Sequence, residues 1–194
     1  MKEPALKGLR FAVAGPSAWD DIVTLFGERG ACAGCWCMFW RVPRKQYDAN
    51  LGTRNKNAFR KIVGGNAQPG VIAYVGKKPV GWCAVAPRAD YIGLERSRIL
   101  KPVDDQPVWS ISCLFIEKEF RRKGLSSKLI RAAAEFASKQ GARIVEGYPV
   151  EPTNKKAPDP FLWHGVSTAF LAAGFKEVLR RSDSRPIMRL VLGD

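Results

Sequence analysis

A basic turn with a central glycine contains residue types that bind phosphate. It runs from Arg121 to Ser127 in the order Arg-Arg-Lys-Gly-Leu-Ser-Ser, between an apolar stretch and a segment with helical periodicity. The first N–H groups of a helix have no partners within the helix, and the helix dipole attracts anions to them. Gly124 lets a ligand approach the backbone, so the turn predicts a phosphate or pyrophosphate site. On these residues alone, an exposed basic helix start is an equally good interpretation.

Three cysteines lie close together in the segment Cys32-Ala-Gly-Cys35-Trp-Cys37. Structural zinc usually takes two separated pairs of ligands, and no second pair follows, although Cys83, Cys113 and His164 would be available. Cys32 and Cys35 have the spacing of a redox pair, but the strand and helix of a thioredoxin-like motif are missing. Buried thiols, or thiols that line a pocket, agree better with the pattern. We therefore expect reduced thiols and no metal.

Aromatic residues near these cysteines and on the expected central strands are further candidates. Trp36, Phe39 and Trp40 fall at helical spacing, which is typical of a core stripe and also of a pocket wall. Trp109 and Tyr148 lie near or on central strands, where core and pocket positions are equally plausible.

The elements that position these residues alternate between strands and helices. Strands are expected at residues 9–14, 71–75, 79–85, 108–116, 143–148, 176–181 and 186–192, and helices at 17–26, 53–63, 125–137 and just before Gly174. A helix between the strands at 108–116 and 143–148 makes those strands parallel, whereas the flanking hairpins are antiparallel. The sheet is therefore expected to be mixed.

The composition is that of one folded domain. Of the 194 residues, 46% are hydrophobic and 10% aromatic, which is enough for a sizeable core and excludes disorder. No apolar run reaches the roughly 18 residues of a membrane helix, and the N-terminus lacks a secretory pattern. Five cysteines cannot all pair with one another. We expect a single cytoplasmic domain over residues 1–194, with its core at 9–192.

Positive charge is the other compositional feature. Lys and Arg number 32 against 18 Asp and Glu, so the formal net charge is +14. The densest basic run lies between Arg41 and Lys61. A polyanionic partner and a solvated surface both explain such a run.

The element order and two motifs resemble the GCN5-related N-acetyltransferase (GNAT) family over residues 9–192. The motifs are Arg121-x-x-Gly124-x-Ser126 after an apolar strand and Phe170-x-x-x-Gly174-Phe175. The family has Gly or Ala where Ser126 stands, and Ser is still small enough for a backbone to approach pyrophosphate. The resemblance implies a single α/β domain whose mixed central sheet is splayed at the cofactor site, with helices on both faces.

The resemblance also implies acetyl-CoA as co-substrate, with no metal. Its pyrophosphate would lie on the N–H groups of the basic turn, and its pantetheine arm would pair with the free edge of the strand at 113–116. The N–H near Leu114 would polarise the thioester carbonyl. The expected cofactor-binding residues are Cys113, Leu114, Phe115, Ile116, Arg121, Arg122, Lys123, Gly124, Leu125, Ser126 and Ser127.

The expected reaction is transfer of an acetyl or short acyl group to a primary amine of an acidic small molecule. Segments 31–63 and 86–106 would cover the acceptor side, and Arg recognises carboxylate or phosphate in a fork geometry. The expected acceptor-binding residues are Trp36, Trp40, Arg41, Arg88 and Trp109. Alternatives are an aminoacyl-tRNA or other polyanion-linked amine as acceptor, and a CoA-binding domain without catalysis. Neither a membrane partner nor an oligomeric state is predicted.

The route of the protons is where this sequence departs from the family. Many members carry a Tyr four residues before the Gly-Phe pair, and here that position is Phe170. His164, the only histidine, is expected to act as base because its ordinary pKa is near neutral, and Tyr148 is a candidate acid. Glu117 and Asp105 are carboxylate alternatives.

Overall fold

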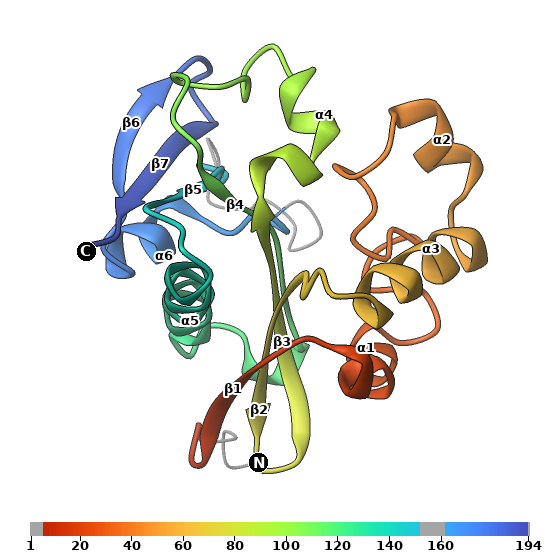
Figure 1. Ribbon diagram of the computed structural model, residues 1–194. Coiled ribbons are helices and arrows are strands. Elements are labelled where there is room, and N and C mark those ends of the chain that lie inside the picture. Colours follow the sequence, from red (N-terminus) through yellow and green to blue (C-terminus); the bar gives the residue numbers. More distant parts are fainter. Residues whose placement is uncertain (1–5, 152–161, 194) are drawn as a thin grey trace.

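One seven-stranded sheet organises the described part of the chain, residues 6–151 and 162–193 of the computed structural model (Figure 1). The strand order is β1-β2-β3-β4-β5-β7-β6. The strands are β1 (Leu9–Val13), β2 (Gly70–Val75), β3 (Lys78–Pro87), β4 (Trp109–Ile116), β5 (Ile144–Gly147), β6 (Lys176–Arg180) and β7 (Pro186–Val191). The helices are α1 (Trp19–Phe26), α2 (Arg44–Ala49), α3 (Thr53–Gly64), α4 (Ile92–Glu95), α5 (Leu125–Lys139) and α6 (Ser167–Ala172), with 3₁₀ turns η1 (Pro16–Ala18), η2 (Arg88–Asp90) and η3 (Lys118–Phe120).

The sheet is mixed, which confirms the prediction. β4 and β5 are parallel, and the other neighbouring strands are antiparallel. β4 pairs with β5 only from Trp109 to Ile111. At the next residue the register between β3 and β4 shifts, so that Ser112 has no pairing partner on β3. Such a β-bulge bends the strand that contains it, here β4. The two central strands therefore diverge beyond Ile111.

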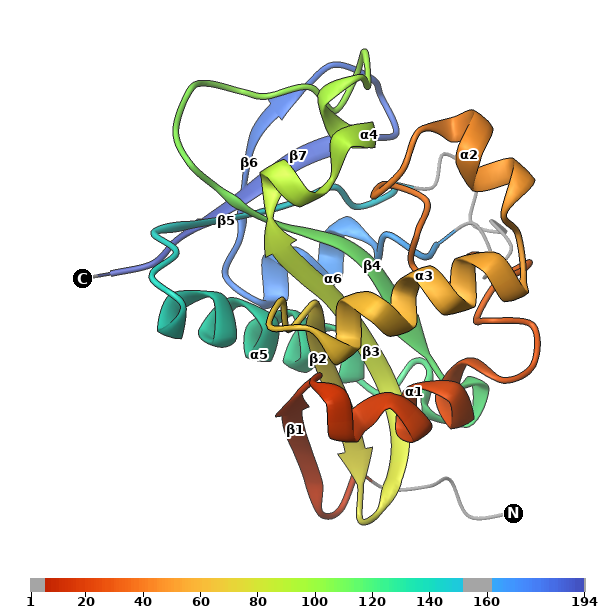
Figure 2. The same cartoon turned by 45° about the vertical axis from the view of Figure 1, so that its right-hand side comes forward.

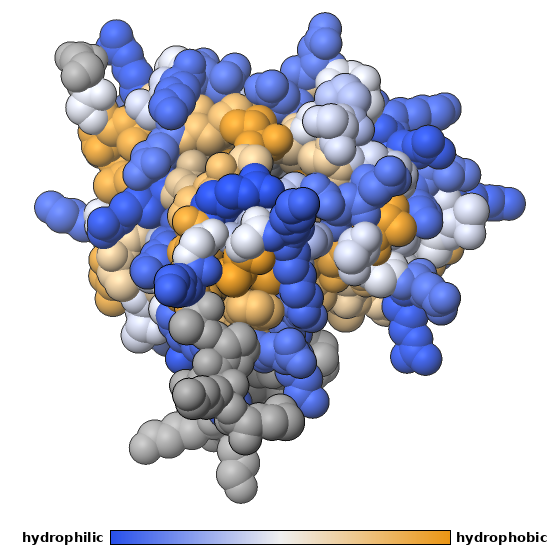
Figure 3. All heavy atoms as spheres, turned by 90° about the horizontal axis from the view of Figure 1, so that it is seen from below, coloured by the Kyte–Doolittle hydropathy of each residue, from blue (hydrophilic) through white to orange (hydrophobic). Residues whose placement is uncertain are grey.

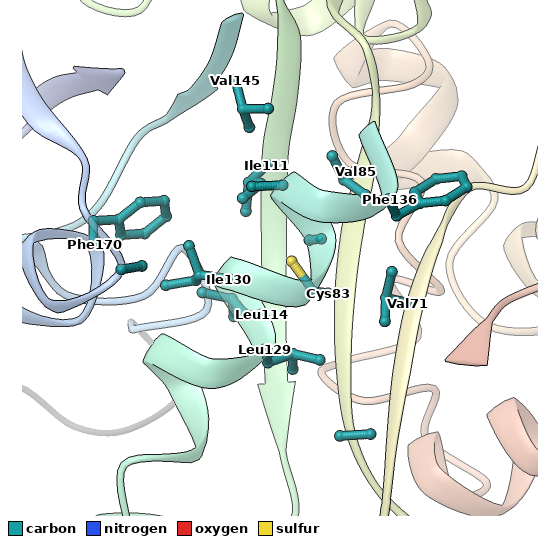
Figure 4. Close-up of a cluster of buried hydrophobic side chains, with 14 of the residues drawn as sticks. Val71, Cys83, Val85, Ile111, Leu114, Leu129, Ile130, Phe136, Val145 and Phe170 are labelled. Carbon is teal, nitrogen blue, oxygen red and sulfur yellow. The ribbon is translucent and has the colours of Figure 1, made fainter. Parts of the chain in front are cut away.

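Helices cover both faces of the sheet (Figures 1 and 2). On one face, α5 buries a stripe at spacings of three and four residues: Leu125, Leu129, Ile130, Ala133, Phe136 and Ala137. Figure 4 shows Leu129 and Ile130 among Cys83, Ile111 and Leu114 of the sheet. On the other face, α1 and α3 pack on Trp82 and Cys113. The strand periodicity thus gives the sheet two separate apolar layers.

The segment between α1 and α2 forms consecutive turns, although its aromatic residues fall at helical spacing. Four residues with side chains adopt positive φ there, namely Ala31, Ala33, Trp36 and Cys37, with angles of 67°, 47°, 42° and 50°. Right-handed helices need negative φ, so this backbone cannot be helical. The helical spacing is therefore not evidence of a helix in this segment.

The segment that joins β3 to β4 is anchored to the sheet. It contains η2 and α4, and its buried Tyr91, Leu94 and Leu100 pack with Tyr148 and Ile187.

No helix among residues 6–151 and 162–193 is long and apolar enough to cross a membrane. In the view from below, hydrophilic side chains interrupt the apolar surface (Figure 3).

Candidate functional site

The basic turn leads from β4 into α5 through an unusual backbone. Buried Phe120 anchors η3, Arg122 adopts a φ of 60°, and Gly124 a φ of 72° directly before the helix. Arg121 Nε donates a hydrogen bond of 2.8 Å to the carbonyl of Ile116, which ties the turn to the end of the strand. The sequence of the turn therefore fixes the position of the α5 N-terminus beside the edge of β4.

The N-terminus of α5 fits an anion. Its N-cap is Gly124, and no side chain of the described residues caps it. A Cβ atom built on Gly124 meets nothing within 4 Å, so the turn is open on that side. The first N–H groups of a fifteen-residue helix are thus left for an external acceptor.

The edge of β4 beside this turn differs from the expected free edge at one position. The N–H of Leu114 donates a hydrogen bond of 2.6 Å to the carbonyl of Trp163. Buried N–H groups need an acceptor, and once β5 has diverged the chain supplies one itself. Gly165 allows this close approach, because a Cβ there would lie 2.6 Å from Leu114 Cδ1. A backbone carbonyl thus binds where we expected a thioester carbonyl to bind.

A cavity of about 170 Å³ lies against this part of β4. Residues 112–115 of β4 form one wall, and the cysteines of the turn segment, Cys32, Cys35 and Cys37, line another. Aromatic side chains close the rest: Phe39, Trp40, Tyr47 and Trp163. The ring of Phe39 meets the rings of Trp40, Tyr47 and Trp163 edge to face, with centroids 4.8, 5.2 and 5.3 Å apart. The cavity is therefore largely apolar and bordered by thiols.

The structure distributes the three expected acceptor-binding aromatic residues over three places. Trp40 lines the 170 Å³ cavity. Trp36 is 1% exposed and packs on Trp19 and Phe26 in the core, with centroids 6.0 and 5.7 Å away. Trp109 lies at the start of β4, where its ring contacts Phe136 of α5 at 5.8 Å. Only Trp40 of the three therefore borders this cavity.

The two expected acceptor-binding arginines are engaged within the protein. Arg41 contacts Asp90 at 3.4 Å and the hydroxyl of Tyr91 at 3.3 Å. Arg88 donates to Glu95 at 2.6 Å, Glu146 at 3.0 Å, the hydroxyl of Tyr148 at 2.6 Å and the carbonyl of Leu100 at 2.7 Å. The geometry gives Arg88 a structural role and does not support its expected binding of the acceptor.

Arg88 and Trp109 line a second, larger cavity of about 780 Å³ at the start of β4. This cavity lies at the opposite end of β4 from the basic turn. Its buried charges, Arg88, Glu146 and Arg189, are paired with one another and with Glu95 and Asp104. Size alone therefore does not make it the better candidate site.

Tyr148 and His164, the expected acid and base, are both buried. The Tyr148 hydroxyl contacts Arg88 and Glu146 at 2.6 Å and Ser110 at 2.8 Å, and burial followed by the charge of Glu146 raises its pKa well above the ordinary value. Tyr148 is not among the residues that line the 170 Å³ cavity. Its acid role stays a prediction that the geometry does not favour.

His164 is 3% exposed, and its ring lies 3.6 Å from the ring of Trp163 at the cavity wall. Burial, and then the positive charge of Arg185, lower the pKa of His164 well below its ordinary value. The imidazole is therefore neutral near pH 7 and a weak base, and its Nδ1 has no hydrogen-bond partner within the described part of the chain. Of the carboxylate alternatives, Glu117 pairs with Lys78 at 2.8 Å, and Asp105 lines the larger cavity.

The sequence did not point to three residues near the site: Arg185, Tyr47 and Ser112. Arg185 Nε is buried with no hydrogen-bond partner among the described residues, and the guanidinium donates to the carbonyl of Tyr148 at 3.3 Å. Burial lowers the pKa of Arg185, and no acidic group of the described residues pairs with it. No local pattern marks these three residues, because Tyr47 and Ser112 reach the cavity from separate elements and Arg185 lies near His164.

A family model described as the acetyltransferase (GNAT) family matches residues 35–159. No curated protein matches the chain.

Within residues 6–151 and 162–193, no group of three or more His, Cys, Asp or Glu side chains is arranged to hold a metal ion.

Several solved structures share the fold at low sequence identity. A GNAT-family acetyltransferase from Listeria monocytogenes has 10% identity and a TM-score of 0.57, with 95% of each chain covered. One from Streptococcus agalactiae has 14% identity and a TM-score of 0.55, covering 96% of this chain and 97% of that one. The PaiA N-acetyltransferase of Thermoplasma acidophilum, in complex with coenzyme A, has 12% identity and a TM-score of 0.51, covering 95% and 99%.

Proposed function

This chain belongs to the GNAT acetyltransferase family, and we propose that it transfers an acetyl or other short acyl group from CoA to a primary amine of an acidic small molecule. The observation that carries the proposal is the open N-terminus of α5, tied to the end of β4, together with the 170 Å³ cavity that residues 112–115 of the same strand line. CoA supplies the acyl group as a reactive thioester. The protein has to hold its phosphates, orient the acyl group and admit an amine.

The basic turn and β4 provide groups for the first two tasks. The N–H groups of residues 122–127 bind the pyrophosphate, and the backbone of residues 113–116 binds the pantetheine amides. The N–H of Leu114 stabilises the oxyanion, once the Trp163 carbonyl has given up its hydrogen bond. The Trp163 carbonyl lies 2.6 Å from this N–H, which supports the access of a carbonyl oxygen to it.

Arg185 supports an acidic acceptor. Its side chain is half-buried and its Nε fully buried, without a carboxylate of the described residues beside it, and burial of a charged group is costly unless an anion compensates it. His164 lies near it and stacks on Trp163, which lines the cavity. An acceptor with its amine in the cavity and a carboxylate or phosphate on Arg185 would supply the missing charge.

The direct test of the cofactor site is Gly124→Glu. The substitution adds a side chain and a negative charge where phosphate binds, in a backbone conformation with a φ of 72° that suits glycine. We expect CoA binding to be abolished in calorimetric titration, while the circular dichroism spectrum stays that of the wild type. Ser127→Ala, which leaves the backbone N–H groups in place, is the control. CoA affinity equal to that of the wild type in a folded Gly124→Glu variant would contradict the proposal.

The acceptor is identified by mass spectrometry of products from acetyl-CoA and a broad amine panel. The panel includes acidic amines, their neutral amides and charged tRNA. Product with the acidic amines and not with their amides supports the proposal. Acetyl-CoA binding without transfer to any amine would instead indicate a CoA-binding domain without catalysis.

A polyanion-linked amine such as aminoacyl-tRNA is the second candidate acceptor. Arg54, Arg60 and Lys61 of α3 are exposed and have no ion-pair partner among the described residues. This basic surface belongs to segment 31–63, which also carries the cysteines and aromatic residues of the cavity. The tRNA alternative requires binding that weakens steeply as the salt concentration rises.

A further inference from the structure

Cys37 borders the cavity and has no role in the function proposed above. It is 9% exposed, and its side chain and residues 112–115 of β4 line the same 170 Å³ space. A reactant in this space therefore lies within reach of both the Cys37 sulfur and the part of β4 that carries the Leu114 N–H.

A hydrogen bond identifies the Cys37 sulfur as an acceptor. Trp82 Nε1 lies 3.1 Å from Cys37 Sγ, and an indole nitrogen can only donate. A sulfur that accepts such a hydrogen bond is better stabilised as a thiolate than as a thiol.

The charged and titratable groups around Cys37 favour the same state. Those that interact with it electrostatically are Cys113 of β4, Cys83 of β3, Cys35 of its own segment, Arg41 and Tyr91. The neighbouring Cys113 thiol lowers the pKa of Cys37 most, with further lowering by Trp82 and the charge of Arg41, against the effect of burial.

The neighbouring acids keep their protons. Burial raises the pKa of Cys35 and of Tyr91 to about 12, and it also raises the pKa of Cys83. The pKa of Cys113 is raised chiefly by its hydrogen bond to Cys37. Cys37 is thus the thiol in this group that ionises first.

The backbone holds Cys37 in a sparsely populated conformation. Trp36 and Cys37 have consecutive positive φ angles of 42° and 50°. The Trp36 ring, packed between Trp19 and Phe26, and the bond from Trp82 hold the turn in place. Strained conformations of this kind persist where surrounding contacts determine them, and they often position functional groups.

We propose that Cys37 is the general base of the acyl transfer, an inference that rests on the function proposed above. As the amine nitrogen attacks the thioester carbon, the N–C bond forms and Cys37 Sγ takes the proton that the nitrogen loses. The C–S bond of the thioester then breaks, and CoA leaves as a thiolate. The proton passes from Cys37 to that thiolate or to water, which restores the Cys37 thiolate.

The first test is Cys37→Ser, which keeps the approximate size of the side chain but replaces the thiolate by a hydroxyl. We expect kcat to fall by roughly a hundredfold or more, with the affinity for CoA unchanged. Cys83→Ala is the matched control, because Cys83 is buried on the α5 face and does not line the cavity. It should retain the wild-type kcat.

The second test uses Trp82→Phe, which removes a hydrogen-bond donor and keeps an aromatic ring against Phe26 and Phe59. Loss of the donor raises the pKa of Cys37, so the acidic limb of the kcat/KM profile should move to higher pH. Ultraviolet titration of the thiolate without substrates should show the same shift, and Cys37→Ser should remove that titration.

The outcomes separate the two proposals. Wild type that binds no CoA, or transfers to no amine, overturns the proposed function and the base together. If the wild-type protein transfers the acyl group and the kcat of Cys37→Ser stays within about threefold of the wild-type value, only the proposed base role of Cys37 is overturned. An acetyl group found covalently on Cys37 by mass spectrometry, on the path to product, also overturns it, because the sulfur would then be a nucleophile.

Discussion

Arg185 differs from Arg41 and Arg88 because no carboxylate of the described residues pairs with it. We expect Arg185→Met to raise the KM for an acidic acceptor about ten- to a hundredfold, the range for losing a charge-assisted hydrogen bond. Met retains an apolar stem in the same space. The KM for acetyl-CoA should not change, and steady-state kinetics with both substrates measures the two values.

The control for Arg185→Met lies on the same hairpin. Arg180→Met removes an exposed arginine that pairs with Glu177 and Glu151 at the surface, and it should leave both KM values unaltered. A neutral amide analogue of the acceptor should not distinguish Arg185→Met from the wild type. An equal rise in KM for the acidic and neutral acceptors would indicate a packing role for Arg185.

The residue type alone does not predict which arginine is paired with a carboxylate, as Arg88 and Arg185 illustrate. Both are arginines on connecting segments, and the sequence singled out Arg88. The partner of Arg88, Glu146, lies 58 positions away along the chain, so no spacing rule reveals that the two pair. The position of Cys37 agrees with one interpretation of its segment, namely thiols that line a pocket. The hydrogen bond that its sulfur accepts could not be predicted, because the donor, Trp82, lies 45 positions away.

At the scale of elements, local patterns predicted the unit from β4 through the basic turn into α5. The fifteen-residue helix is long enough to show its hydrophobic periodicity, and a long apolar strand and a glycine turn precede it. The helices α2 and α4, of six and four residues, were not predicted. The bond from Leu114 to Trp163 was also unforeseen, because it depends on where β5 diverges.

Side-chain packing restricts the end of β5, where this strand separates from β4. A Cβ atom on Gly147 would lie 2.1 Å from the ring of Phe170, the residue at the usual Tyr position of the family. Phe170 is fully buried and also packs on Phe175 at 5.2 Å, so it has little room to move. The ring therefore fills the space that the missing side chain of Gly147 leaves.

We expect Gly147→Ala to reduce the free energy of unfolding by about 1–3 kcal/mol, the usual cost of overpacking a core. Urea unfolding followed by circular dichroism measures this change. Gly64→Ala is the control, because a Cβ at Gly64 meets no atom within 4 Å, and it should be neutral or slightly stabilising. Equal stability of Gly147→Ala and the wild type would mean that Phe170 does not hold this position rigidly.

At the scale of the whole molecule, a buried ionic network joins the segment between β3 and β4 to the far side of the sheet. Glu146 of β5 is fully buried and accepts hydrogen bonds from Arg88 at 3.0 Å and Arg189 at 2.8 Å. Arg189 of β7 also donates to Asp104 at 2.6 and 3.0 Å. Buried charges are tolerated only when they are paired, so the network fixes how this segment lies on the sheet.

The outer member of this network makes stability depend on pH. The hydrogen bond from Arg189 lowers the pKa of Asp104 from its ordinary 3.8 to about 2. A carboxyl group with a lower pKa in the folded state binds fewer protons there than in the unfolded chain, so it stabilises the fold above its ordinary pKa. This contribution is lost as the pH falls from about 4 towards about 2.

We therefore expect Asp104→Asn to be less stable than the wild type near neutral pH and to lose less stability on acidification. The difference between the two urea midpoints should shrink as the pH falls from about 4 to about 2, since protonated Asp104 resembles Asn in charge. Asp105→Asn, which removes the neighbouring carboxylate that has no bond to Arg189, should not reproduce this narrowing. A gap between Asp104→Asn and the wild type that stays constant over that range would show that the Asp104 charge does not hold the segment to β7.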